Sequence, residues 1–175
     1  YDDDLGALAA NGNVYVSMDN YILTADSLYY DIKKDVLFAE GNLRIKDEEG
    51  KIITGQRAVL KDKLKKGVID EFILRLPDGS LIMAASADRY DKNRVSLHKA
   101  NFTPCKIFCG NKPIWQIKAK DTNIDYEKQQ ITYKNMFFEV FGIPVVYLPY
   151  FFHPTPAASA KSGILVPQIT KNKLV

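Results

Sequence analysis

The sequence contains only two histidines, His98 and His153, and they lie far apart in the chain. Neither has a carboxylate or a cysteine at the spacing of a metal site. Nucleophile-elbow, phosphate-loop and dinucleotide-binding motifs are also missing. These absences predict a protein that is not an enzyme and that needs no cofactor or metal.

Long apolar runs are missing as well, and none approaches the roughly 20 residues of a membrane-spanning helix. The first residues, Tyr1 to Asp4, do not form a signal peptide. The chain is therefore expected to be cytosolic, or exported with its leader removed. A net charge of +3 over 175 residues is too small to predict nucleic-acid binding.

Cysteine is scarce, and Cys105 and Cys109 are four residues apart. Two thiols alone cannot complete a zinc shell. Half of a metal site, a pair of free thiols and a disulfide all remain compatible with this spacing.

The alternation of apolar and polar residues that is typical of strands is abundant. It occurs in five runs: 13–17, 43–46, 71–76, 115–120 and 131–134. Turn signals lie between them at 11–13, 40–42, 48–50, 77–79 and 91–93. This spacing predicts an all-β sandwich, barrel or solenoid. Leu60, Leu64 and Val68 also fit a short amphipathic helix, but the repeat described next favours a hairpin there.

A weak repeat runs through the chain. Gly12-Asn13-Val14-Tyr15-Val16 recurs as 41–45, and Leu23-Thr24-Ala25-Asp26 recurs as 53–56, 82–85 and 117–120. A period near 30 residues that holds two strands is a stackable β unit. In each copy a small residue follows an apolar one by two positions, so both face one side of the sheet. That side either leaves room inside the protein or forms a tight core.

The segment 137–154 is aromatic and β-branched, and Pro144, Pro149, Pro154 and Pro156 interrupt it. Proline removes a backbone donor and fixes φ, which excludes a long helix or a central strand. We expect an extended, kinked connector that buries its aromatic rings and leads into a further large region.

Five runs carry a resemblance to a known family: 101–105, 115–117, 131–135, 141–150 and 161–167. Through them the chain resembles the amino-terminal periplasmic domain of the LPS-assembly outer-membrane protein family LptD, the organic-solvent-tolerance family. Its repeat is similar to that of the periplasmic lipopolysaccharide-bridge proteins. The block 141–167 is the most specific part of the match.

The resemblance implies an open β-jellyroll built from repeats of about 30 residues, ending in a proline-rich linker to an outer-membrane β-barrel. Residues 1–11 would be a lead-in and 12–140 the periplasmic, OstA-like jellyroll. Residues 141–161 would form the hinge and 162–175 the start of the barrel. Pro167 would weaken pairing at the barrel gate, because proline cannot donate to a strand ladder.

The implied function is lipopolysaccharide transport at the outer membrane, with this region on the periplasmic side. The domain would receive lipopolysaccharide from the bridge protein and hold its acyl chains inside. It would then pass the lipid to the barrel for insertion in the outer leaflet. The expected partners are the bridge protein, paired to an edge strand at 13–17 or 21–25, the chain's own barrel facing 137–152, and the plug lipoprotein inside that barrel.

The alternation selects the residues expected to line the lipid-binding interior. They are Val14, Val16, Leu23, Ala25, Phe38, Leu43, Ile45, Ile53, Phe72, Leu74, Ile82, Ala84, Ile117, Ala119, Phe138 and Val140. In the family a cysteine matching Cys105 joins a partner near the barrel's end, whereas Cys109 has no counterpart. The two either close a local loop or reach cysteines outside this sequence. A soluble bridge protein and a β scaffold or adhesion domain with a solid core are the alternatives.

Overall fold

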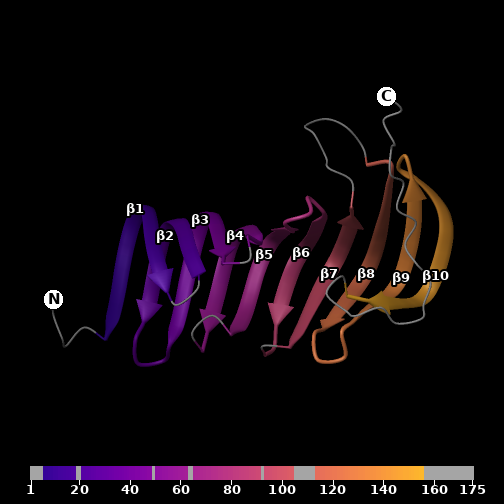
Figure 1. The fold of residues 1–175 in the computed structure, drawn as a ribbon. Helices are drawn as coiled ribbons and strands as arrows, with labels where there is room; N and C mark the ends of the chain where they lie inside the picture. Colours follow the sequence, from indigo (N-terminus) through magenta and orange to yellow (C-terminus); the bar gives the residue numbers. More distant parts are fainter. Residues whose placement is uncertain are drawn as a thin grey trace.

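The computed structural model describes residues 6–18, 21–48, 50–62, 65–91, 93–104 and 113–155. These residues form a single antiparallel sheet in which each strand pairs with the next along the chain (Figure 1). The strands are β1 (Ala7–Met18), β2 (Tyr21–Asp31), β3 (Val36–Asp47), β4 (Ile52–Lys61), β5 (Lys66–Arg75), β6 (Leu81–Arg89), β7 (Arg94–Thr103), β8 (Trp115–Asp125), β9 (Gln130–Val140) and β10 (Ile143–Pro154). The sheet is open, with β1 and β10 as its edges.

The predicted all-β class is confirmed. The helix considered for 56–68 is not formed, since β4 and β5 make a hairpin there with Lys61 paired to Lys66. No helix in the described part of the chain has the length and apolarity needed to span a bilayer.

A row of kinks with positive φ crosses the sheet near the middle of the odd-numbered strands, and register shifts show that those in β1 and β3 are β-bulges. Asn13, Asn42, Glu71, Lys99 and Asn135 have positive φ angles of 47°, 46°, 54°, 50° and 49°. They lie in β1, β3, β5, β7 and β9, and strand pairing skips a position at each of them. The repeat of about 30 residues is therefore one hairpin with one kink. Because a left-handed residue turns the direction of its strand, as a bulge does, the row folds the sheet lengthwise into two facing layers.

Two of these bulges correct the sequence prediction. Gly12-Asn13 and Gly41-Asn42 were expected to be turns between strands, but they lie within β1 and β3. Glycine and asparagine tolerate positive φ in turns and bulges alike, so residue type alone does not separate the two. At Gly41 only glycine fits, because a Cβ atom there would collide with the side chain of Asp26.

The core lies between the two layers, and each strand contributes to it from both sides of the row of kinks. In β5, Ile69 and Phe72 lie on either side of the kink and are both buried. Leu43 and Leu97 are among the most deeply buried side chains, at 1% and 0% exposure. The predicted pairing of small and apolar residues on one side is confirmed for Leu23 and Ala25, both of which are buried.

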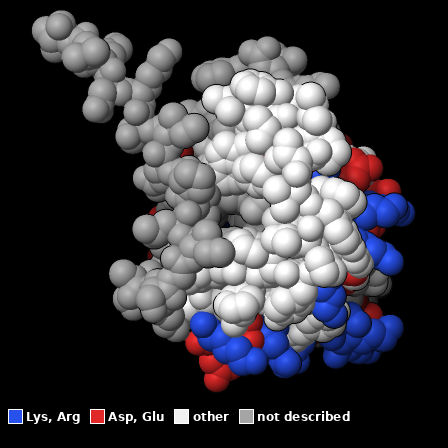
Figure 2. Space-filling model, turned by 90° about the vertical axis from the view of Figure 1, so that its right-hand side faces the viewer, with Lys and Arg blue, Asp and Glu red and all other residues white. Residues whose placement is uncertain are grey.

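The expected connector is the last strand of the sheet. β10 pairs with β9 along its whole length, from Ile143 opposite Val140 to Pro154 opposite Gln130. Its prolines are tolerated because β10 is an edge strand. The rings were expected to be buried, but Tyr147, Tyr150 and Phe152 are at least half exposed in this chain. Figure 2 views this end of the molecule, where uncharged side chains predominate over the described surface.

Candidate functional site

An open cavity of about 290 Å³ lies between the two layers at the centre of the sheet. Its inner wall is apolar and comes from both halves of the strands. The apolar lining residues are Ile45, Ile53, Leu60, Ile69, Phe72, Leu74, Ala87, Val95, Leu97 and Ile124. The volume is near the lower end of the roughly 300–1,000 Å³ that small-molecule sites occupy. Its chemistry suits a hydrocarbon chain.

Polar groups are confined to the mouth of the cavity. Tyr21, Asp47 and Lys51 line it from the turn end of β2 to β4, and Lys66, Arg89 and Tyr126 line it from the opposite turns. The site is therefore amphipathic, with a dry interior and a charged entrance.

The interior becomes nearly solid toward β9. The next space along it, beside Ala100, Ile131 and Tyr133, has a volume of only about 10 Å³. The hydroxyl of Thr122 borders this space and is buried without a hydrogen-bond partner. The sequence left two alternatives for the interior, an open space or a tight core. The interior is open at the centre of the sheet, whereas it is tightly packed toward β9.

A buried polar pair links β9 to β10 at that packed end. The hydroxyl of Tyr133 donates to Nε2 of His153 over 2.9 Å. Nδ1 of His153 lies 2.6 Å from the carbonyl oxygen of Pro154 and donates to it. Burial raises the pKa of the Tyr133 hydroxyl and lowers the pKa of the His153 imidazole. Both groups are therefore held neutral.

The two histidines do not approach one another. His98 lies on the outer face, with Nε2 3.0 Å from Asp88 and Nδ1 3.0 Å from Asp121. Its two nitrogens point to different carboxylates and do not converge on one point. Within the described residues no group of three or more His, Cys, Asp or Glu side chains is arranged to hold a metal ion.

Most of the predicted lining residues face the interior. Leu23, Ala25, Leu43, Ile45, Phe72, Leu74, Ile82, Ala84, Ile117 and Ala119 are buried, and Val14, Val16, Ile53, Phe138 and Val140 are partly buried against the same core. Of these, Ile45, Ile53, Phe72 and Leu74 line the main cavity. Whether any of them contacts lipid stays a prediction.

Phe38 is wrong as an interior residue. It is 44% exposed on the outer face, where its ring lies 6.0 Å from that of Tyr29. The alternation in β3 places Leu37 and Ala39 inside, and Phe38 falls between them.

Sequence reasoning missed the part of the wall beyond the row of kinks, including Leu60, Ile69, Ala87, Leu97 and Ile124. A signal for them exists, since inward residues are three apart across a kink rather than two. Ile69 and Phe72 show this spacing, as do Leu97 and Ala100. Cys105, Cys109 and Pro167 lie outside the described residues.

Comparison with known proteins supports the predicted resemblance. No family model matches the chain. The LPS-assembly protein LptD of Paracidovorax citrulli is 29% identical over 161 residues, covering 90% of this chain and 20% of the relative. LptD of Pseudoalteromonas translucida is 28% identical over 162 residues, covering 92% and 21%. LptD of Burkholderia lata is 27% identical over 169 residues, covering 94% and 21%.

The resemblance to LptD is thereby confirmed, and the chain spans about one fifth of the length of these curated relatives. Among solved structures, the fold is similar to LptH of Pseudomonas aeruginosa, described as the LptA-homologous periplasmic component of a lipopolysaccharide transport device. The TM-score is 0.51 at 16% identity, covering 78% of this chain and 95% of LptH. The predicted open β-jellyroll is confirmed by this likeness, whereas the linker and the barrel start stay predictions.

Proposed function

We propose that this chain carries lipopolysaccharide as the periplasmic part of an LptD-like outer-membrane assembly protein. The observation that supports this most directly is the apolar cavity inside an open, LptA-like sheet. Acyl chains gain about 0.8 kcal/mol for each CH₂ group removed from water. A dry interior with a charged mouth therefore binds a lipid tail without specific polar contacts and leaves the sugar in water.

The two edges of the sheet suit the two hand-over steps. At one end β1 pairs only with β2 among the described strands, so its other side offers backbone groups to a strand of a bridge protein. At the other end β10 exposes apolar side chains such as Ile143, Tyr150 and Phe152, which suits contact with the barrel and its plug lipoprotein. In this proposal the chain works at the outer membrane, on its periplasmic side, without catalysis.

The alternative of a soluble bridge protein is supported by the likeness of the fold to LptH. The sequence similarity favours LptD, at 27–29% identity over about 90% of the chain. A scaffold with a solid core is disfavoured by the central cavity.

Photo-crosslinking to lipopolysaccharide tests the proposal with a matched pair of phenylalanines. Phe72 is 6% exposed and lines the cavity, whereas Phe38 is 44% exposed on the outer face. A photoreactive phenylalanine analogue at position 72 is expected to label lipopolysaccharide, and the same analogue at position 38 is not. Equal labelling from both positions, or none from position 72, would contradict the proposal.

A further inference from the structure

Three basic side chains stand at the mouth of the otherwise apolar cavity. Lys51 follows the turn between β3 and β4, Lys66 begins β5, and Arg89 ends β6. Arg89 is paired with Gly67, the residue after Lys66, so these two cations are carried by adjacent strands. Lys51 reaches the same mouth from the opposite rim.

The ion pair of Lys66 is weak enough for this lysine to take another anion. Nζ of Lys66 lies 3.6 Å from Asp62, and both side chains are about half exposed, at 54% and 50%. An exposed pair at such a distance contributes little stability, so a dianion can replace the Asp62 carboxylate at small cost. Lys51 is held more firmly, because Asp47 lies 3.9 Å from its Nζ and also accepts its backbone N–H at 2.8 Å.

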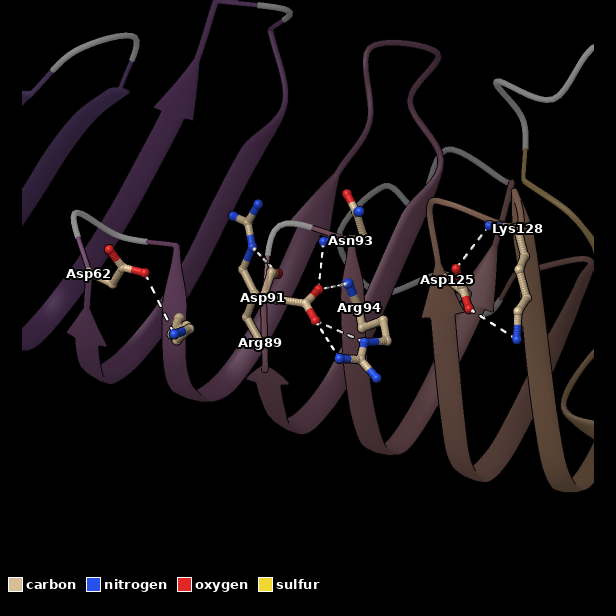
Figure 3. Close-up of polar contacts among 8 residues, drawn as sticks. Asp62, Arg89, Asp91, Asn93, Arg94, Asp125 and Lys128 are labelled. Atoms are coloured by element: carbon tan, nitrogen blue, oxygen red, sulfur yellow. Dashed lines mark hydrogen bonds and ion pairs between the residues drawn. The ribbon is translucent and has the colours of Figure 1, made fainter.

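The guanidinium of Arg89 is oriented by its own turn. Its Nε donates to the backbone carbonyl oxygen of Asp91 over 3.2 Å (Figure 3). This bond holds the group beside the cavity that the side chain lines. A guanidinium presents paired donors that match phosphate oxygens, and lysine adds a point charge.

Two further lysines lie in turns on the rim that carries Lys66 and Arg89, and they provide a contrast by their position. Lys34 pairs with Asp31 at 3.2 Å and Lys128 pairs with Asp125 at 3.7 Å. In both turns the carboxylate also accepts the backbone N–H of that lysine, at 3.0 Å and 2.9 Å. Neither lysine lines the cavity.

We propose that Lys51, Lys66 and Arg89 form a phosphate-binding site for the head group of an acylated amphiphile whose chains occupy the cavity. This rests on the proposed function and names the part of the ligand that the mouth recognises. The cations would select phosphorylated lipids and hold each head at the slit between the layers, with its chains inside.

The test compares lipid A carrying its phosphates with the same lipid A after dephosphorylation. The mouth variant combines Lys66→Gln and Arg89→Gln. The control combines Lys34→Gln and Lys128→Gln and removes the same charge from the same rim. Thermal melting followed by circular dichroism checks that both variants fold. Affinity of the mouth variant for phosphorylated lipid A is expected to fall at least about tenfold, with affinity for the dephosphorylated lipid unchanged. The control is expected to bind both lipids as the wild type does.

Each other outcome separates this proposal from the function on which it rests. Suppose that the wild type binds both lipids and that the mouth variant either keeps both affinities or loses both equally. This result overturns the phosphate site but leaves the proposed lipid carriage intact. An equal loss of affinity for phosphorylated lipid A in the control variant also overturns the site, because the effect then comes from the net charge of the protein. Saturable binding of inorganic phosphate alone would assign the site to the free ion. Wild type that binds neither lipid contradicts the proposed function and this site with it.

Discussion

The hydroxyl of Tyr133 donates a 2.9 Å hydrogen bond to Nε2 of His153 inside the sheet. Their rings are also stacked, with centroids 5.5 Å apart. Since His153 lies in β10 and Tyr133 in β9, this pair fastens the last strand to the packed end of the core. The bond needs a neutral imidazole, because Nδ1 already donates to Pro154 and Nε2 must accept.

Stability is therefore expected to depend on pH through His153. Burial lowers its pKa below the ordinary value of 6.5, so the unfolded chain takes up a proton before the folded chain does. The stabilising contribution is complete above pH 6.5 and decreases as the pH falls toward the folded pKa. Urea denaturation between pH 7.5 and about pH 5 should show the wild type weakening more steeply than His153→Gln. Parallel slopes for the two proteins would contradict this.

The positive φ angles in the row of kinks predict substitutions that stabilise the fold. Glu71 and Lys99 are exposed and have φ angles of 54° and 50°, where Asn13, Asn42 and Asn135 occupy the equivalent places. A left-handed conformation costs most residues roughly 1–2 kcal/mol and asparagine less. Glu71→Asn and Lys99→Asn are each expected to raise the free energy of unfolding by about 0.5–1 kcal/mol, measured by chemical denaturation.

The reverse change is the control for this prediction. Asn42→Ala should destabilise the protein by about 1–2 kcal/mol, through the strained φ and loss of the 2.8 Å hydrogen bond to Asp26. If Glu71→Asn and Lys99→Asn both destabilised the protein, φ would not limit stability at these two positions.

Much of the fold could be predicted from the sequence because alternation reports directly which residues face inward. It located Leu43, Ile45, Ile117 and Ala119 in the core. It failed where a local signal has two meanings: Gly41-Asn42 suits a turn or a bulge, and only strand pairing decides. Glutamate is not a residue type that indicates a positive φ, so the conformation of Glu71 could not be predicted from its identity.

The site was less predictable than the fold for the same reason. The far wall of the cavity lies beyond the row of kinks, where the alternation of inward and outward residues shifts by one position in each strand. Leu60 and Leu97 therefore belong to the cavity although no single alternating run includes them with Ile45 or Phe72. The cations of the mouth come from separate turns, and only the folded sheet brings Lys51 to the same opening as Lys66.

The two interior spaces differ in size, and a pair of alanines tests the difference. Ala87 lines the cavity of about 290 Å³, and Ala100 lines the space of about 10 Å³. Ala87→Leu should leave the melting temperature nearly unchanged while reducing lipopolysaccharide binding, because the added atoms enter open space. Ala100→Leu should destabilise the fold by about 1–3 kcal/mol through overpacking. Equal destabilisation by the two would contradict an open cavity at the centre.

The free edge of β1 gives the last prediction. Tyr15 pairs with Thr24 of β2 and its side chain is 63% exposed, so it adds little to the core. Strand addition at this edge uses backbone donors, which proline lacks and alanine keeps. Tyr15→Pro is therefore expected to abolish capture of the periplasmic bridge protein in a pull-down while the domain stays folded. Tyr15→Ala should bind as the wild type does. Full binding by a folded Tyr15→Pro protein would exclude pairing at this position, and equal loss in Tyr15→Ala would assign recognition to the ring instead of the backbone.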